Sequence, residues 1–81
     1  MRIDKYLKVS RIIKRRTVAS SACQAGRVVV NGKAVKASYD VKVGDIIEIM
    51  FGQRVVIVRV EKLLETTKKD QVDEMYTDLS D

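Results

Sequence analysis

The stretch GRVVVNGKAV, residues 26–35, decides the fold, because an Asn-Gly pair stands between two runs of apolar residues. Both residues of a tight type I′ hairpin turn need a positive φ, and Asn31 followed by Gly32 meets that need. We therefore predict a β-hairpin, with one strand over residues 28–30 and the returning strand over residues 33–35.

Strand signals continue after this hairpin. A Val-Gly-Asp turn at residues 43–45 precedes an isoleucine-rich run, and Phe-Gly-Gln at residues 51–53 separates that run from a longer strand over residues 54–64. Side chains of the longer segment fall on two alternating faces, as expected of a half-buried strand. One face carries Val56, Val58 and Val60, and the other carries Ile57 and Arg59. The chain after residue 26 therefore predicts a small antiparallel sheet.

Helical spacing marks the residues before the hairpin. Apolar residues four positions apart predict a short amphipathic helix over residues 2–8, and residues 10–16 read as a basic turn. A second helix is predicted over residues 18–25, with Thr17 as its N-cap and Gly26 just beyond its end. The fold class is therefore α+β, with two or three short N-terminal helices packed on the sheet.

The C-terminal residues differ in character from the rest. Residues 70–81 contain five acids and no base, yet they carry an i, i+3, i+4, i+7 apolar stripe, namely Val72, Met75, Tyr76 and Leu79. This stripe predicts a short docking helix, and the alternative is a frayed, solvated terminus. We divide the chain into a domain over residues 1–64 and an acidic tail over residues 65–81.

Composition excludes several classes of function. The chain has no histidine, and its single cysteine, Cys23, lies among small apolar residues that predict a buried thiol. No cluster has metal-ligand spacing, no nucleophile stands beside a base, and the four glycines are too far apart for a phosphate-binding loop. We expect no enzyme activity, no cofactor and no metal.

The same composition indicates where the protein works. The longest aliphatic run, residues 55–58, is far shorter than the roughly 20 residues of a membrane span. The opening residues are too charged for a secretory signal, and one cysteine fits a reducing compartment. We expect a soluble, cytoplasmic monomer without a membrane partner.

Charge is strongly divided along the chain. The first 36 residues contain ten bases and one acid, Asp4, for a net charge of +9, whereas residues 37–81 carry −4. A segment of +9 repels itself unless a polyanion neutralises it, which argues against the alternative of a merely solvated face. The predicted RNA-binding residues are Arg2, Lys5, Arg11, Lys14, Arg15, Arg16 and Lys33, although the sequence leaves open whether Lys33 and Lys36 contact RNA.

Structured RNA suits this basic segment better than B-DNA. No helix aligns Asn, Gln or Arg side chains to read base edges, and aromatic residues are few. Tyr6 and Tyr39 could stack on bases, but the spacing of Tyr6 predicts a core residue. Binding through shape and backbone predicts a log–log salt dependence of order −0.7 to −0.9 per neutralised phosphate.

An ordered set of motifs over residues 1–50 resembles the alpha-L RNA-binding domain, which is named after small-subunit ribosomal protein four. The resemblance implies short helices on a small antiparallel sheet, with RNA bound by the helical surface and the adjoining turn. The motifs are Arg2-Ile3-Asp4-Lys5-Tyr6-Leu7, Ser10-Arg11, Lys14-Arg15-Arg16-Thr17, Ala19, Ala22, Gly26-Arg27-Val28, Val30-Asn31-Gly32 and Val43-Gly44-Asp45.

Within that family, a short chain with an acidic end resembles the ribosome-associated quality control P group. It is also similar to the fifteen-kilodalton heat-shock RNA-binding protein, which typically has a basic C-terminal extension. The resemblance implies binding to stalled large ribosomal subunits, with contacts to large-subunit ribosomal RNA and peptidyl-tRNA, while a tailing factor extends the nascent chain. Arg2 and Arg16 match the RNA-contacting arginines of this group.

Two other functions stay open at this point. The chain could be the RNA-targeting module of a separate RNA-modifying enzyme, such as a pseudouridine synthase or methyltransferase. It could also be an adaptor whose acidic tail binds a basic partner protein.

Overall fold

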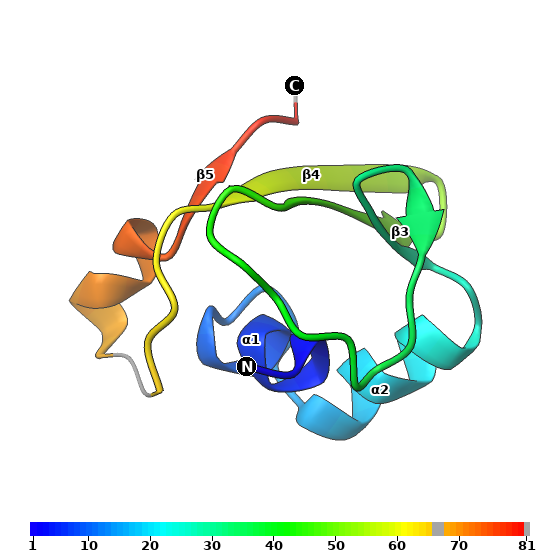
Figure 1. Cartoon of the computed structure of the whole chain (residues 1–81), viewed down its shortest axis with the longest axis horizontal. Helices are drawn as coiled ribbons and strands as arrows, with labels where there is room; N and C mark the ends of the chain where they lie inside the picture. Colours follow the sequence, from blue (N-terminus) through cyan, green and yellow to red (C-terminus); the bar gives the residue numbers. More distant parts are fainter. Residues whose placement is uncertain (66–67, 81) are drawn as a thin grey trace.

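The protein has two layers, with two short α-helices on one face of a five-stranded antiparallel sheet (Figure 1). The computed structural model describes residues 1–65 and 68–80. The strand order is β2-β1-β3-β4-β5, and the α+β prediction is confirmed. In chain order the elements are α1 (Ile3–Val9), α2 (Arg16–Gln24), β1 (Val28–Val30), β2 (Lys33–Ala34), β3 (Ile46–Phe51), β4 (Arg54–Val60), the 3₁₀ helix η1 (Lys69–Glu74) and β5 (Tyr76–Asp78).

The Asn-Gly hairpin forms as predicted. Asn31 has φ 51° and Gly32 has φ 86°, and Val30 pairs with Lys33 across the turn. The side chain of Asn31 also reaches the next strand, because its Oδ1 accepts a hydrogen bond of 3.0 Å from the backbone N–H of Ile46. The turn residue therefore fixes the hairpin to β3 as well as closing it.

The predicted start of the second helix is wrong and its predicted end is right. Arg15, which is extended at φ −123° and ψ 135°, occupies the N-cap position and makes no side-chain cap hydrogen bond. Thr17 therefore lies within the first turn of α2, where its hydroxyl cannot act as the N-cap. At the other end Gly26 adopts φ 74° directly after the C-cap residue.

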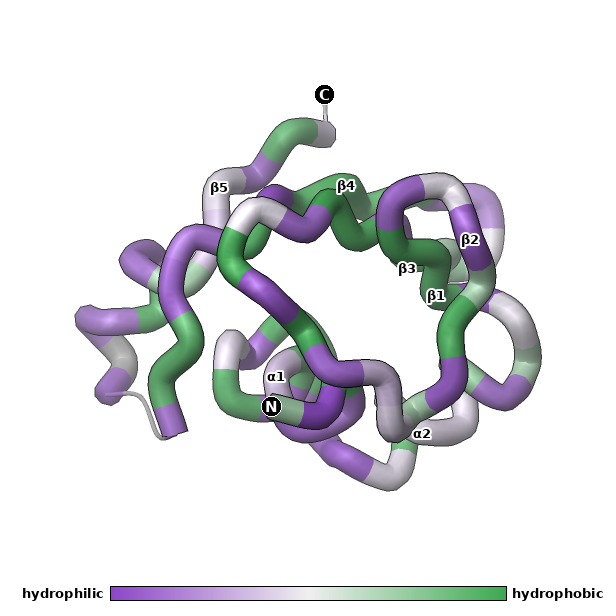
Figure 2. Tube along the Cα trace, in the orientation of Figure 1, coloured by the Kyte–Doolittle hydropathy of each residue, from purple (hydrophilic) through white to green (hydrophobic). Residues whose placement is uncertain are grey.

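The core lies between the helices and the inner face of the sheet. Apolar residues are concentrated in β1, β3 and β4 (Figure 2), and the pairing of Ile47 with Val58 places both side chains on the buried face. Cys23 is 5% exposed, as predicted, and burial raises the pKa of its thiol. Tyr6 is fully buried, which confirms it as a core residue.

The predicted strand over residues 54–64 is too long. β4 ends at Val60, because the next two residues turn toward the C-terminal segment. The backbone N–H groups of Glu61 and Lys62 both donate to the carbonyl oxygen of Met75, at 2.8 and 3.2 Å. This carbonyl also accepts a hydrogen bond of 2.8 Å from the Tyr6 hydroxyl, so three donors from two parts of the chain converge on it.

In the described part of the tail, the apolar stripe forms neither one continuous docking helix nor a frayed terminus, the two alternatives that the sequence left open. The apolar stripe is divided between η1 and β5, and Tyr76 pairs with Val60 at the edge of the sheet. Met75, between the two elements, is fully buried. Its carbonyl is taken by donors outside the tail, so a continuous helix through this residue would lose those contacts. Residues 66, 67 and 81 of the predicted tail lie outside the described residues.

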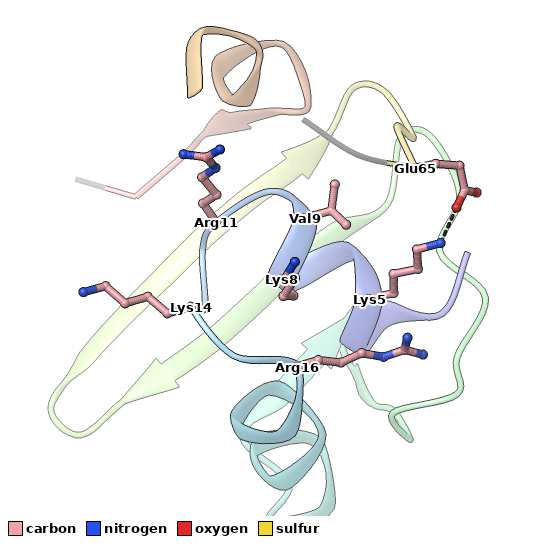
Figure 3. A pocket seen from close by; sticks show the side chains of 7 residues that line it. All are labelled: Lys5, Lys8, Val9, Arg11, Lys14, Arg16 and Glu65. Atoms are coloured by element: carbon pink, nitrogen blue, oxygen red, sulfur yellow. Dashed lines mark hydrogen bonds and ion pairs between the residues drawn. The ribbon is translucent and has the colours of Figure 1, made fainter. Parts of the chain in front are cut away.

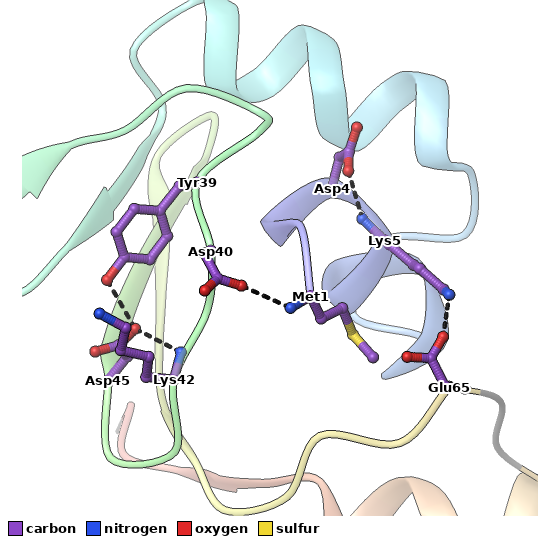
Figure 4. Close-up of polar contacts among 8 residues, drawn as sticks. All are labelled: Met1, Asp4, Lys5, Tyr39, Asp40, Lys42, Asp45 and Glu65. Carbon is purple, nitrogen blue, oxygen red and sulfur yellow. Dashed lines mark hydrogen bonds and ion pairs between the residues drawn. The ribbon is translucent and has the colours of Figure 1, made fainter.

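One buried carboxylate organises the loop before β3 (Figure 4). Asp45 is 8% exposed and accepts hydrogen bonds from the Tyr39 hydroxyl at 2.9 Å, the Lys42 backbone N–H at 3.0 Å and the Asn31 amide at 3.0 Å. Burial alone would raise the pKa of Asp45, but these hydrogen bonds outweigh it and lower the pKa below the ordinary 3.8.

We expect Asp45→Ala to lower the free energy of unfolding by roughly 2–3 kcal/mol, because three donors lose a charged acceptor. Since the folded pKa is lowered, this stabilisation is fully present above pH 3.8 and is lost as the pH falls through the folded value. Urea denaturation across that range measures both effects. Asp73→Ala, at an exposed position of η1, is the control and should change stability by less than about 0.5 kcal/mol.

Candidate nucleic-acid interface

An open hollow of about 800 Å³ lies between α1, the loop that joins α1 to α2, and the chain at residue 65 (Figure 3). We call it the cationic hollow, because five basic side chains and one acid line it. The lining residues are Lys5, Lys8, Val9, Arg11, Lys14, Arg16 and Glu65.

Local structure explains how the bases converge. Lys5 and Lys8 are three residues apart on α1 and so lie on neighbouring turns of one face. Arg11 then reverses the chain. Its backbone has φ 63°, a left-handed conformation that residues other than glycine rarely adopt, and its N–H donates to the carbonyl of Lys8 at 3.0 Å. Ile13 is buried and anchors the loop, while Lys14 beside it is exposed.

Asp4, the only acid in the basic segment, holds two of the arginines. Its side chain is 5% exposed; one carboxylate oxygen accepts a hydrogen bond of 3.1 Å from the Arg2 guanidinium, and the other forms an ion pair of 3.3 Å with the Arg16 guanidinium. Arg2 precedes α1 and Arg16 begins α2, so this carboxylate ties together the starts of both helices. The Lys5 backbone N–H donates a second hydrogen bond to this carboxylate, at 2.7 Å.

Glu65 closes one side of the hollow. Its carboxylate forms an ion pair with the Lys5 ammonium (Figures 3 and 4), and that hydrogen bond lowers the pKa of Glu65. The Glu65 side chain is 76% exposed, so solvent screens the pair and its contribution to stability is small. This acid competes with any anion for Lys5.

The structure brings together most of the predicted RNA-binding residues. Lys5, Arg11, Lys14 and Arg16 line the cationic hollow, and Arg2 is joined to it through Asp4.

Two predicted residues lie elsewhere, and one lining residue was missed. Arg15 is exposed beside Arg16 but does not line the hollow, and Lys33 lies on β2, the edge strand next to β1. Lys8 was left out of the prediction, although its spacing of three from Lys5 is the helical signal that could have found it.

Other kinds of site have no support in the part of the chain that the structure describes. Residues 1–65 and 68–80 contain no group of three His, Cys, Asp or Glu side chains placed to hold a metal ion. Within the same residues, no helix has the length and apolar character needed to cross a membrane.

Comparisons with known proteins agree with this geometry. Residues 1–47 match the S4 domain family. The chain is 52% identical over 81 residues to an RQC P-site tRNA stabilizing factor of Bacillus subtilis, covering 100% of this chain and 94% of that protein. A protein of the same name from Helicobacter pylori is 37% identical over 73 residues, covering 86% and 87%.

A solved structure shows the same fold. The trimeric structure of Vibrio cholerae Heat Shock Protein 15 superposes with a TM-score of 0.89 at 26% identity, covering 96% of this chain and 80% of that chain. The resemblance drawn from the sequence motifs is confirmed. By its S4 domain and its full-length similarity to the Bacillus protein, the chain belongs to the S4-domain family of RQC P-site tRNA stabilizing factors.

Proposed function

We propose that this protein is a non-catalytic RNA-binding factor of ribosome-associated quality control. It binds large-subunit ribosomal RNA and peptidyl-tRNA on stalled large subunits, and it supports C-terminal tailing of the nascent chain by a separate tailing factor. It acts in the cytoplasm, as a monomer bound to the subunit. The observation that carries the proposal is the cationic hollow, and the names of the full-length relatives support it.

The hollow has the chemistry of a phosphate-binding surface. Arginine presents a planar fork of donors that matches phosphate oxygens, and lysine adds flexible point charges. Asp4 holds Arg2 and Arg16 before RNA arrives, so less conformational entropy is lost when phosphates bind. Surfaces of this kind read the backbone and shape of folded RNA and carry little sequence information.

The residues available for chemistry favour a binding role. The chain has no histidine to act as a general base, and burial raises the pKa of its one thiol, at Cys23, so this thiol is a poor nucleophile near neutral pH. The described residues instead concentrate charge at one face of α1 and its following loop. Holding a tRNA in place requires only such contacts.

We expect Arg16→Ala and Arg2→Ala each to weaken association with peptidyl-tRNA-bearing large subunits roughly five- to tenfold, the loss expected for one charge-assisted phosphate contact. Each variant should keep the wild-type circular dichroism spectrum, because both side chains are about half exposed. Co-sedimentation with purified subunits measures the association, and a reconstituted tailing reaction measures its consequence for tail length.

Arg59→Ala is the matched control, since Arg59 lies outside the cationic hollow, on β4, and pairs with Glu61. It should co-sediment like the wild type. Wild-type association and tailing by both Arg2→Ala and Arg16→Ala would contradict the proposal.

A further inference from the structure

A second hollow of about 460 Å³ lies beside the first, where the helical layer ends and the sheet continues. We call it the aromatic hollow. Arg11 lines both hollows, and Figure 3 shows its side chain turned away from Lys5 and Arg16. The lining residues of the aromatic hollow are Arg11, Ile12, Phe51, Arg54, Val56, Tyr76 and Asp78.

The register of the sheet explains why apolar groups are uncovered here. Ile49 pairs with Val56 and Phe51 pairs with Arg54, so these side chains continue the inner face that is buried farther along the strands. Beyond the helices nothing in the described chain covers this face fully: Phe51 is 40% exposed, and Val56 and Tyr76 are half-buried. Two aromatic rings and an aliphatic surface therefore face a solvent-filled space.

Arginines flank this apolar surface on two sides. Arg11 enters from the α1–α2 loop in its left-handed conformation, and Arg54 stands at the start of β4. Aromatic rings accept stacked bases of any sequence, and neighbouring guanidinium groups bind the accompanying phosphates or stack in turn. The aromatic hollow therefore has what a flipped-out nucleotide requires, next to a surface suited to the RNA backbone.

The remaining polar group restricts which base fits. The Oδ1 atom of Asp78 accepts hydrogen bonds from the Ser80 hydroxyl and, at 2.9 Å, from the Ser80 backbone N–H, so the carboxylate is held in place. These bonds lower the pKa of Asp78, which is therefore ionised and an acceptor only at neutral pH. Guanine alone among the four bases presents two adjacent donors, N1–H and N2–H, on its Watson–Crick edge, whereas adenine places an acceptor there.

We infer that the aromatic hollow binds an unpaired guanine nucleotide of the RNA whose backbone lies in the cationic hollow. The guanine base stacks against Tyr76, its N1–H and N2–H donate to the Asp78 carboxylate, a neighbouring base stacks against Phe51 at the other end of the hollow, and Arg11 and Arg54 bind the flanking phosphates. This inference rests on the proposed function, because it assigns a second contact to the same bound RNA. It adds a base preference to an otherwise backbone-directed surface.

Fluorescence anisotropy at fixed salt tests this with three probes: the oligoribonucleotides UUUGUUU and UUUAUUU, and a fully paired RNA duplex. Wild-type protein should bind UUUGUUU roughly tenfold more tightly than UUUAUUU, the discrimination of one well-formed bidentate contact. Asp78→Asn should reduce that ratio to about one, and Phe51→Ala should weaken binding of both oligonucleotides. Both side chains are exposed, so thermal unfolding should confirm that each variant is folded.

Equal wild-type affinity for UUUGUUU and UUUAUUU would overturn the inference, as would a guanine preference retained by Asp78→Asn. If the duplex still binds and Arg16→Ala weakens that binding, the proposed function stands while the guanine site fails. If the duplex does not bind at all, the proposed function itself fails.

Discussion

Asp4→Asn is expected to bind structured RNA about tenfold more weakly than the wild type, although the substitution makes the protein one unit more positive. A general electrostatic attraction would predict the opposite sign. The loss arises because Asp4 orients Arg2 and Arg16 through contacts of 3.1 and 3.3 Å, and an amide holds a guanidinium less firmly than a carboxylate does. Equilibrium binding at one salt concentration measures the effect.

Glu65→Gln is the control for Asp4→Asn, because it removes another carboxylate that contacts a base of the cationic hollow, Lys5. Glu65 is largely exposed and only occupies Lys5, so its loss should free a cation and raise RNA affinity roughly two- to threefold. The two substitutions change net charge equally and should act in opposite directions. Tighter binding by both would show that Asp4 does not position the arginines.

Met75→Ala is expected to lower the free energy of unfolding by about 2–5 kcal/mol, the usual range for truncating a fully buried methionine. A chain of 81 residues has a small core and limited stability, so the variant should be partly unfolded at 37 °C. Urea denaturation monitored by circular dichroism measures the loss.

Leu79→Ala tests the same stripe at an exposed position. Leu79 is 41% exposed beyond β5, so its truncation should change stability by no more than about 0.5 kcal/mol. Equal losses from Met75→Ala and Leu79→Ala would indicate that one continuous helix buries both side chains, contrary to the structure.

The parts of the fold that sequence could predict are those set by neighbouring residues. The Asn31-Gly32 turn requires a backbone conformation that few other pairs adopt, and Gly26 ends a helix for the same reason. Alternation along β4 likewise reports which face is buried. These signals need no knowledge of the rest of the chain.

The tail could not be predicted, because distant contacts decide it. The pattern through Val72, Met75 and Tyr76 fits a helix by spacing alone. In the fold, the Tyr6 hydroxyl, 69 residues away, and the backbone of residues 61 and 62 bind the Met75 carbonyl. Tertiary contacts therefore override a weak local preference.

The candidate site, like the fold, could be predicted from the sequence only in part. The concentration of bases near the N-terminus was visible in composition, and it located the surface. The roles of Asp4 and Glu65 were not visible, since Arg16 lies 12 residues from Asp4, and Glu65 lies 60 residues from Lys5. Such pairings depend on how α1, α2 and the C-terminal segment pack.

The central claim, that a local cationic surface rather than net charge binds RNA, is tested most directly by the salt dependence of RNA affinity in two matched variants. Each replaces four exposed or partly exposed bases by alanine: Lys5, Lys8, Lys14 and Arg16 in the first, and Lys33, Lys36, Lys42 and Lys62 in the second. The first should reduce the log–log slope by about 3, from a loss of roughly 0.7–0.9 per phosphate contact, and the second should leave it near the wild-type value. Equal reductions in both variants would contradict the account.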